Sequence, residues 1–397
     1  MAILAYQGWW MALNAHFRHN PLSHAFAPVP SLLRWLPGSV DGATSVSMML
    51  RVTALFFAFC VASDMSAQYR WRQRIWLTVG LAGTSIVLLG LLQRASDAPM
   101  IFWEKRPTIS PFFATYYYGG NAGSYINLVF PLVLGLAAMA IRDPDAHAKR
   151  SLWIASSFLC LAGAAVNVSR TAQIITGCVL VIHLLREGRR LARGEWLPSR
   201  TFLILYAALA VVVVAGLAVF TGLDKPIHKW ELLQRQVNGQ NPRWLALHAC
   251  MRMLPDAGFC GLGPGTFEIA FPHYTYGLDK MIAGIWRYAH DDYLQTILEW
   301  GLIGAFFWAV FFFGALLKCC AGAWFHAKPG FVGDSTLLFC AGLALAGVAI
   351  HALVDFPLQI ASLQVYVAAY MGLAWSSGLW QPAELPAPPS RGPRRFR

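Results

Sequence analysis

Three residues that suit phosphate chemistry stand at the starts of predicted helices. Arg170 and Arg243 fall in the first turn of their helices, where a cation opposes the helix dipole, and His290 directly precedes a third helix. A residue that breaks a local rule invites a functional interpretation. Guanidinium groups and helix N-termini both bind phosphate oxygens. The three residues therefore predict an anion site if they lie on one face, although Arg243 could instead bind a lipid headgroup.

Carboxylates accompany His290. Asp291 and Asp292 fall in the first turn of its helix, where capping and dipole compensation are the simpler explanation. Asp355 follows a further histidine at the end of a later apolar run. Glu299 would be costly in lipid, so we expect it to face the bundle interior. A His-Asp-Asp metal site would need more ligands, and no Glu-x-x-His or His-x-x-x-His spacing is nearby, so we predict neither metal nor cofactor.

A glycine-rich stretch, residues 255–267, lies between the second arginine and the histidine. It is not a phosphate-binding loop, because no Gly-Lys-Ser/Thr follows and no parallel βαβ pattern surrounds it. Gly261, Gly263 and Gly265 are expected to supply positive φ angles or close backbone approach.

The segment before these glycines is predicted to be a helix, residues 241–254. Its apolar side chains recur at helical spacing and predict a stripe that faces either the membrane surface or the bundle. The stripe consists of Trp244, Leu247, Met251 and Leu254.

The elements that must position these residues are membrane-spanning helices. Hydrophobic residues make up 57% of the 397 residues and charged residues only 13%, whereas a soluble domain is about a quarter charged. Apolar runs long enough to cross a hydrocarbon core of roughly 30 Å recur along the chain. The predicted fold class is all-α, a polytopic membrane helical bundle of about nine spans with a large helical extracytoplasmic loop. The predicted spans are Val46–Ser63, Ile75–Leu92, Tyr125–Ile141, Leu152–Val166, Ala172–Leu185, Thr201–Phe220, Leu298–Leu317, Thr336–Leu353 and Ile360–Trp375.

Basic residues alternate between the connections of these spans. The short connections at 70–74, 142–150 and 186–200 are rich in Arg and Lys, which is typical of the cytoplasmic side. The net charge of +12 is therefore a topology signal, and nucleic acid is not needed to explain it. The opposite connections then face outward, toward the periplasm of a bacterial inner membrane. All the candidate residues named above fall on that outward face.

The same alternation predicts three parts of the chain. Residues 1–45 form an extracytoplasmic N-terminal segment, residues 46–378 a transmembrane domain that includes the periplasmic loop 221–297, and residues 379–397 a disordered cytoplasmic tail rich in Pro and Arg. This topology places Met1 outside, with neither a span nor a signal peptide before it. We therefore expect an odd number of further spans upstream of residue 1.

The order of these motifs resembles the O-antigen ligase and polymerase superfamily. The resemblance rests on Ser169-Arg170, on Arg243 followed by the stretch 255–267, and on His290 separated from Gly301 by ten residues, the spacing found in the ligases. Further similarities are Gly119-Gly-Asn121 and His351…Asp355-Phe356, and the resemblance covers roughly Val46 to Trp375.

Two departures from the family pattern stand out. Asp291 occupies the position after the motif histidine where the family commonly has Asn. The chain also has fewer predicted spans than the family usually has, which agrees with the missing upstream spans and puts in doubt whether this polypeptide alone is active.

The resemblance implies a membrane glycosyltransferase of the GT-C type. Such an enzyme moves a glycan from undecaprenyl diphosphate to an acceptor, in ligases the lipid A-core, at the periplasmic face and with inversion at the anomeric carbon. Arg170 and Arg243, with Arg252 as a further substrate contact, would hold the diphosphate and stabilise its charge, so that no metal is required.

The resemblance also implies a role for the histidine. His290 would act as a general base for the acceptor hydroxyl or as a further phosphate contact, and Asp291 or Asp355 would orient it. Glu299 and two glycines of the loop, Gly263 and Gly265, are assigned supporting roles.

Other functions are compatible with the same sequence. Within the superfamily, an O-antigen or polysaccharide polymerase and a protein O-oligosaccharyltransferase differ only in acceptor. A transporter is the alternative from another class, and it should place charges at mid-membrane. Arg51 is the one basic residue well inside a predicted span, which argues against transport. An inactive fragment is the last alternative.

Overall fold

The computed structural model describes most of the chain. The described residues are 1–106, 112–143, 145–194, 215–216, 224–231, 242–277, 284–325 and 332–380. The predicted span Thr201–Phe220, apart from residues 215–216, and the predicted tail from residue 381 onward lie outside the described residues.

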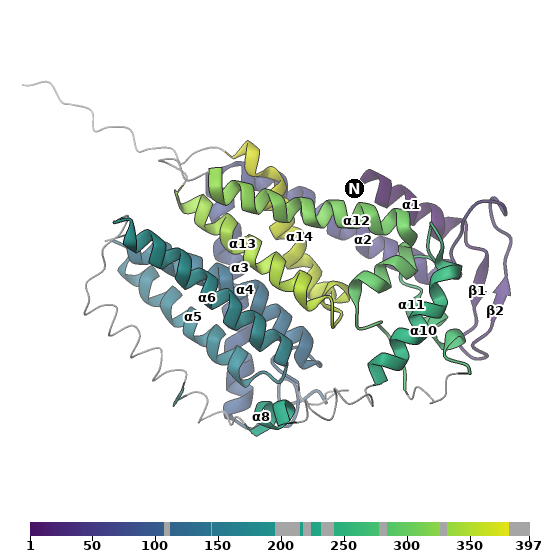
Figure 1. Cartoon of the computed structure of the whole chain (residues 1–397), viewed down its shortest axis with the longest axis horizontal. Helices are drawn as coiled ribbons and strands as arrows, with labels where there is room; N and C mark the ends of the chain where they lie inside the picture. Colours follow the sequence, from purple (N-terminus) through teal and green to yellow (C-terminus); the bar gives the residue numbers. More distant parts are fainter. Residues whose placement is uncertain are drawn as a thin grey trace, which may run out of the picture.

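The described part of the chain is mostly helical, as predicted (Figure 1). The α-helices are α1 (Ala2–Leu13), α2 (Gly42–Ala67), α3 (Tyr69–Ala95), α4 (Gly119–Arg142), α5 (His147–Val166), α6 (Arg170–Ala192), α8 (Asp224–Glu231), α10 (Pro242–Ala257), α11 (Phe267–Ala270), α12 (Asp292–Phe325), α13 (Val332–His351) and α14 (Ala361–Ser376). Short 3₁₀ helices follow at η1 (Phe271–Tyr274), η2 (Pro357–Gln359) and η3 (Ser377–Leu379). Strands β1 (Phe17–His19) and β2 (Phe26–Pro28) pair as an antiparallel hairpin.

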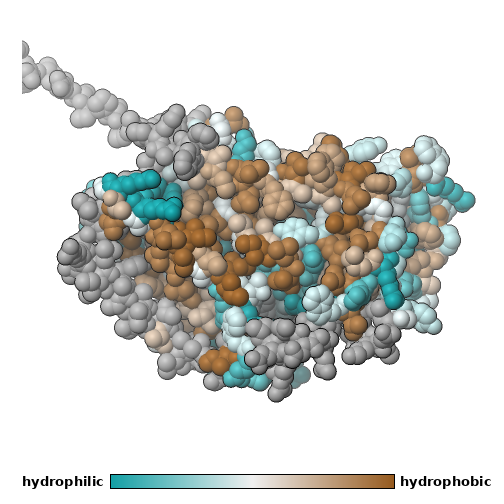
Figure 2. Space-filling model, in the orientation of Figure 1, coloured by the Kyte–Doolittle hydropathy of each residue, from teal (hydrophilic) through white to brown (hydrophobic). Residues whose placement is uncertain are grey.

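Five of the described helices are long and apolar enough to cross a membrane: α2, α3, α4, α12 and α13. Helices α5, α6 and α14 coincide with three more predicted spans but do not meet the same criteria of length and composition. Figure 2 shows hydrophobic residues over much of the face that includes α12 and α13, with hydrophilic residues at the end that carries β1 and β2 and at the opposite end, where α6 ends. The chain is therefore a multi-pass membrane protein, and within the described residues these criteria identify five of the about nine predicted spans.

Helix α4 forms the centre of the bundle. It packs against α3, α5, α6 and α13, and nearly all of its residues are buried. Small residues allow this close packing: a Cβ atom on Gly123 would lie 2.3 Å from the Cβ of Ala172 in α6. One turn further along α4, Asn127 accepts a hydrogen bond from Thr176 Oγ1 at 2.6 Å and donates to the Ala172 carbonyl. These contacts fix the start of α6 against the start of α4.

Helix α10 confirms the predicted helix at 241–254, but its buried face differs from the predicted stripe. Trp244 and Met251 are 56% and 54% exposed, so the alternative in which the stripe faces the bundle is wrong. The face that α10 buries carries smaller side chains, which let the helix lie close to α12. The buried residues are Ala246, Ala249, Cys250 and Met253.

A buried ion pair joins the start of α3 to the start of α13. Arg72, at the start of α3, is fully buried and donates from Nε and Nη2 to the two carboxylate oxygens of Asp334 in α13 at 3.0 and 2.8 Å. Its guanidinium also lies 4.5 Å from the ring centre of Trp380. A bidentate pair of this kind compensates two charges that would otherwise be buried at great cost.

We predict that Asp334→Ala destabilises the protein by about 3–5 kcal/mol, because it leaves the Arg72 charge buried without its carboxylate. The apparent unfolding temperature in detergent measures the loss. In the control Arg74→Met an exposed arginine is removed, and its effect should stay within about 0.5 kcal/mol. Equal effects of the two substitutions would contradict the prediction.

Candidate functional site

The structure brings His290 and Asp355 together although 65 positions separate them in sequence. The Nδ1 atom of His290, just before α12, lies 3.1 Å from Oδ1 of Asp355, which follows α13. The aspartate is buried and the histidine is partly exposed. A carboxylate in this position fixes the orientation of the imidazole ring and leaves Nε2 as the nitrogen that can exchange a proton with a substrate.

Asp355 is enclosed by groups from two other helices. Its Oδ2 lies 3.9 Å from Nε2 of His351, whose Nδ1 lies 2.6 Å from the Ser124 hydroxyl of α4. A Cβ atom on Gly120 would stand 2.3 Å from the same Oδ2, so a residue with a side chain at this position would displace the carboxylate. Burial alone would raise the pKa of Asp355, but the hydrogen bond from His290 and the charges of Arg243, His290 and His351 lower it below its ordinary value.

Arg243 joins the same cluster through Tyr118. In the first turn of α10, its Nη1 donates to the Val354 carbonyl at 2.9 Å and its Nη2 donates to the Tyr118 hydroxyl at 3.0 Å. Burial and the nearby Asp355 charge raise the pKa of the Tyr118 hydroxyl, so it stays protonated. Arg243 and the His290–Asp355 pair therefore belong to one network.

Sequence reasoning missed Tyr118. The motif Gly119-Gly-Asn121 was noted, but the tyrosine before it was not. Its ring stacks on Phe356 at 5.4 Å between ring centres, and Phe356 also stacks on Tyr288 at 4.4 Å. The only signal available in the sequence was its position beside a predicted helix start on the outward face.

His290 has a strained backbone. Its φ angle is +57°, a left-handed conformation that a non-glycine residue adopts only when the surroundings enforce it. Aromatic edges hold the ring on two sides, with Phe356 at 4.8 Å and Trp286 at 5.4 Å between ring centres. Such strain is often found at functional sites.

Glu299 organises the glycine-rich stretch. Its carboxylate accepts hydrogen bonds from the backbone N–H of Gly265 at 2.9 Å, from that of Phe267 at 3.3 Å and from the Gln295 amide at 3.0 Å. Gly263 and Gly265 have φ angles of +117° and +78°, as the sequence predicted. Both glycines therefore act on the shape of the loop, and Glu299 lies buried in the bundle as expected.

The glycine-rich stretch also supplies hydrogen-bond partners at a break in helix α12. Gly301 has φ +67° and ψ −175°, which interrupts the helix. The carbonyls of Leu298 and Glu299 accept hydrogen bonds from the loop, and the N–H of Ile303 donates back to the Phe259 carbonyl at 3.1 Å. Backbone groups freed in a membrane helix need such partners, so the break and the loop depend on each other.

The remaining candidates lie elsewhere. Asp291 accepts hydrogen bonds from the N–H groups of Tyr293 and Leu294, both at 3.0 Å, and therefore caps α12. Arg252 is exposed and donates to the Tyr276 carbonyl. Arg170 starts α6. This helix packs against Gly123 of α4, one turn from Gly120, which contacts Asp355. The described contacts do not join the Arg170 guanidinium to His290. In the described part of the chain, no group of three or more His, Cys, Asp or Glu could hold a metal ion.

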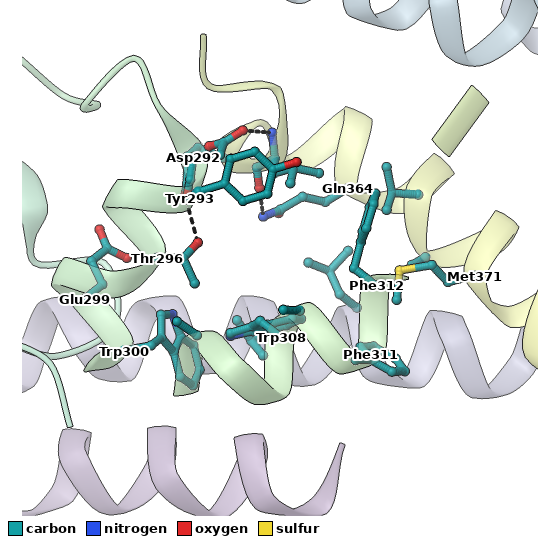
Figure 3. A pocket seen from close by; sticks show the side chains of 18 of the residues that line it. Asp292, Tyr293, Thr296, Glu299, Trp300, Trp308, Phe311, Phe312, Gln364 and Met371 are labelled. Atoms are coloured by element: carbon teal, nitrogen blue, oxygen red, sulfur yellow. Dashed lines mark hydrogen bonds between the residues drawn. The ribbon is translucent and has the colours of Figure 1, made fainter. Parts of the chain in front are cut away.

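An apolar cavity of about 320 Å³ lies between α2, α12 and α14 (Figure 3). Asp292, Tyr293 and Gln364 lie along one side of it, and Glu299 lies toward one end. Most of the remaining lining is aromatic and aliphatic. The turn η2 contributes Leu358 and Gln359 to its lining.

We predict that Gly301→Ala lowers the apparent unfolding temperature markedly. A Cβ atom there would meet the Phe259 backbone at 2.3 Å and would disfavour the positive φ angle. The matched control is Gly177→Ala in α6, where a Cβ atom meets nothing within 4 Å and where alanine favours the helix by up to about 1 kcal/mol. If both variants unfold at the wild-type temperature, the close packing of the glycine-rich stretch against Gly301 is not required for stability.

The lowered pKa of Asp355 predicts a pH dependence of stability. Its contribution is complete above the ordinary aspartate pKa of 3.8 and is lost as the pH falls through the lower folded pKa. The difference in unfolding temperature between wild type and Asp355→Asn should therefore be larger at about pH 5 than below about pH 4. A difference that grows toward acid pH would contradict this assignment.

Comparison with known proteins supports the motif assignment. Residues 155–309 match the family model described as O-antigen ligase. The matched segment contains Arg170, Arg243 and His290, whereas Tyr118 and Asp355 lie outside it. No curated protein matches the chain. Residues 155–309 of the chain are therefore similar to the O-antigen ligase family.

Proposed function

We propose that the protein is a ligase-type glycosyltransferase that moves a glycan from undecaprenyl diphosphate to a lipid A-core or similar acceptor at the periplasmic face of the inner membrane. The observation that carries the proposal is the pairing of His290 with the buried Asp355, with Arg243 joined to the same network through Tyr118. The match of residues 155–309 to the O-antigen ligase family supports a lipid-linked glycan as the substrate class.

His290 acts as the general base in this proposal. The acceptor hydroxyl oxygen forms a bond to the anomeric carbon of the glycan while the bond from that carbon to the diphosphate oxygen breaks. The hydroxyl proton passes to Nε2 of His290, and Asp355, 3.1 Å from Nδ1, stabilises the imidazolium that forms. A single displacement of this kind inverts the anomeric configuration.

Arg243 contacts the departing diphosphate. A guanidinium beside the oxygens that gain charge stabilises the transition state more than the ground state. Tyr118 and the Val354 carbonyl fix its orientation, so that little reorganisation is needed during the reaction. Arg170 and Arg252 are proposed as further contacts to the substrate, on the basis of the predicted outward face alone.

The apolar cavity is proposed to take part of the isoprenoid chain. Its walls are aromatic and aliphatic, the surface that such a chain requires. Of the described residues, no Arg, Lys or His lines the cavity, so it offers no cation to a phosphate. We therefore place the diphosphate beside Arg243 and His290 and not in the cavity.

The proposal predicts that His290→Ala and Arg243→Ala each lower glycan transfer by about 10²–10⁴-fold, the usual worth of a general base or of a charge-stabilising donor. The chain is expressed in a ligase-deficient Gram-negative host that supplies donor and core, and lipopolysaccharide banding is compared at matched membrane levels. His273→Ala and Arg287→Ala, which change exposed residues outside the network, are the controls and should restore a normal ladder.

The alternatives give different results in the same experiment. Longer carrier-linked glycans without a ladder would identify a polymerase, and glycosylated membrane proteins would identify a protein O-oligosaccharyltransferase. If the wild-type chain changes no glycan, the proposed function is wrong for this chain.

A further inference from the structure

The side chains of Arg51 and Asp292, from different helices, form hydrogen bonds with the turn η2. Arg51, in α2, donates from Nη2 to the Gln359 carbonyl and from Nε to the Gln364 side chain at 2.8 Å. Asp292, at the start of α12, accepts the Leu358 N–H at 2.8 Å through its Oδ2. Two consecutive residues of one short turn are thus held by a guanidinium and a carboxyl group from different helices.

We propose that Arg51 and Asp292 are positioning residues that hold η2 and thereby keep Asp355 in line with His290. The inference rests on the proposed function for its catalytic part, because it assigns these residues to the same site. Neither residue contacts the substrate in this scheme.

The connection from the turn to the site is short. Asp355 lies two residues before Pro357, the first residue of η2, and its Oδ1 both accepts the Phe356 N–H at 3.2 Å and faces His290. His290 precedes α12, whereas Asp355 belongs to the segment between α13 and α14. A shift of η2 therefore changes the distance between the two groups.

Asp292 links the two partners directly. Its backbone N–H donates to the Ala352 carbonyl at 2.9 Å, while its side chain holds the turn that follows Asp355. The residue is only 1% exposed, and it lies two positions after His290. The start of α12 is thus tied both before and after Asp355.

The charge of Arg51 needs an explanation. A cation within an apolar helix is expensive, and such residues usually serve a function. Glu299 lies near enough for its charge to act on the guanidinium. The same side chain reaches both α14 and η2, which a neutral side chain of that length could do only with fewer hydrogen bonds.

Asp292 and the two glutamines that Arg51 contacts, Gln359 and Gln364, line the cavity. Figure 3 shows Asp292 and Gln364 along the same side of it. Of the described residues, His290, Asp355 and Tyr118 are not part of that lining. The side chains of Arg51 and Asp292 therefore hold the turn and are not placed beside the proposed reacting groups.

The test compares disruptive and conservative variants of the full chain in membranes. Arg51→Gln and Asp292→Ala should lower kcat for glycan transfer by up to about 100-fold with little change in the donor KM, because small misplacements of a general base act on the rate. Arg51→Lys and Asp292→Asn retain a donor to Gln359 and an acceptor for Leu358, and should recover much of the rate. Arg94→Gln, a change to another half-buried arginine, is the control.

A second measurement does not depend on activity. The part of the pH dependence of the unfolding temperature that is lost in Asp355→Asn should also be lost in Arg51→Gln and kept in Arg51→Lys, because neither Arg51 variant removes a carboxyl group. If Arg51→Gln keeps that pH dependence, or if Arg51→Gln and Asp292→Ala keep the wild-type kcat per folded molecule, the positioning role is wrong. If the wild type has no transfer activity but its unfolding temperature shows this pH dependence, and the variant loses it, the proposed function is wrong. The holding of η2 by these side chains would then still be supported.

Discussion

The structure depends on the requirement that every backbone group inside a membrane finds a hydrogen-bond partner. Helix α12 breaks at Gly301, and the glycine-rich stretch supplies the missing donors and acceptors. Gly261 and Gly301 face each other so closely that a Cβ atom on either would meet the backbone of the other segment. Glu299 then fastens the same stretch through two backbone N–H groups. The loop is thereby fixed to the helix that His290 precedes.

The residues of the candidate site lie at the ends of helices. Arg243 starts α10, His290 precedes α12, Tyr118 precedes α4, and Asp355 follows α13. Helix ends are rigid supports, so polar side chains at these positions are held accurately. The aromatic stack around Phe356 fills the space between the ends and keeps the polar groups in place. Four separate segments thus contribute to one network.

The sequence predicted the individual residues better than their partnerships. Periodicity located the helices, and the rule-breaking position of Arg243 marked it as a functional candidate. Asp291 and Asp355 could not be separated as partners of His290, because capping and orientation both need a carboxylate near a helix start. The structure shows that Asp291 caps the helix while Asp355 faces the imidazole. Tyr118 was missed because its contact with Arg243 joins residues 125 positions apart, and no periodic pattern records such a contact.

The central claim is that this chain catalyses an inverting transfer from a lipid diphosphate. The most direct test incubates the purified chain with a lipid A-core acceptor and an undecaprenyl-diphosphate-linked glycan of known anomeric configuration. Nuclear magnetic resonance of the product then gives the configuration of the new glycosidic bond. The account predicts a new bond of inverted configuration with release of undecaprenyl diphosphate, because one displacement by a deprotonated hydroxyl inverts the carbon. A product of retained configuration, or the absence of any product, would contradict it.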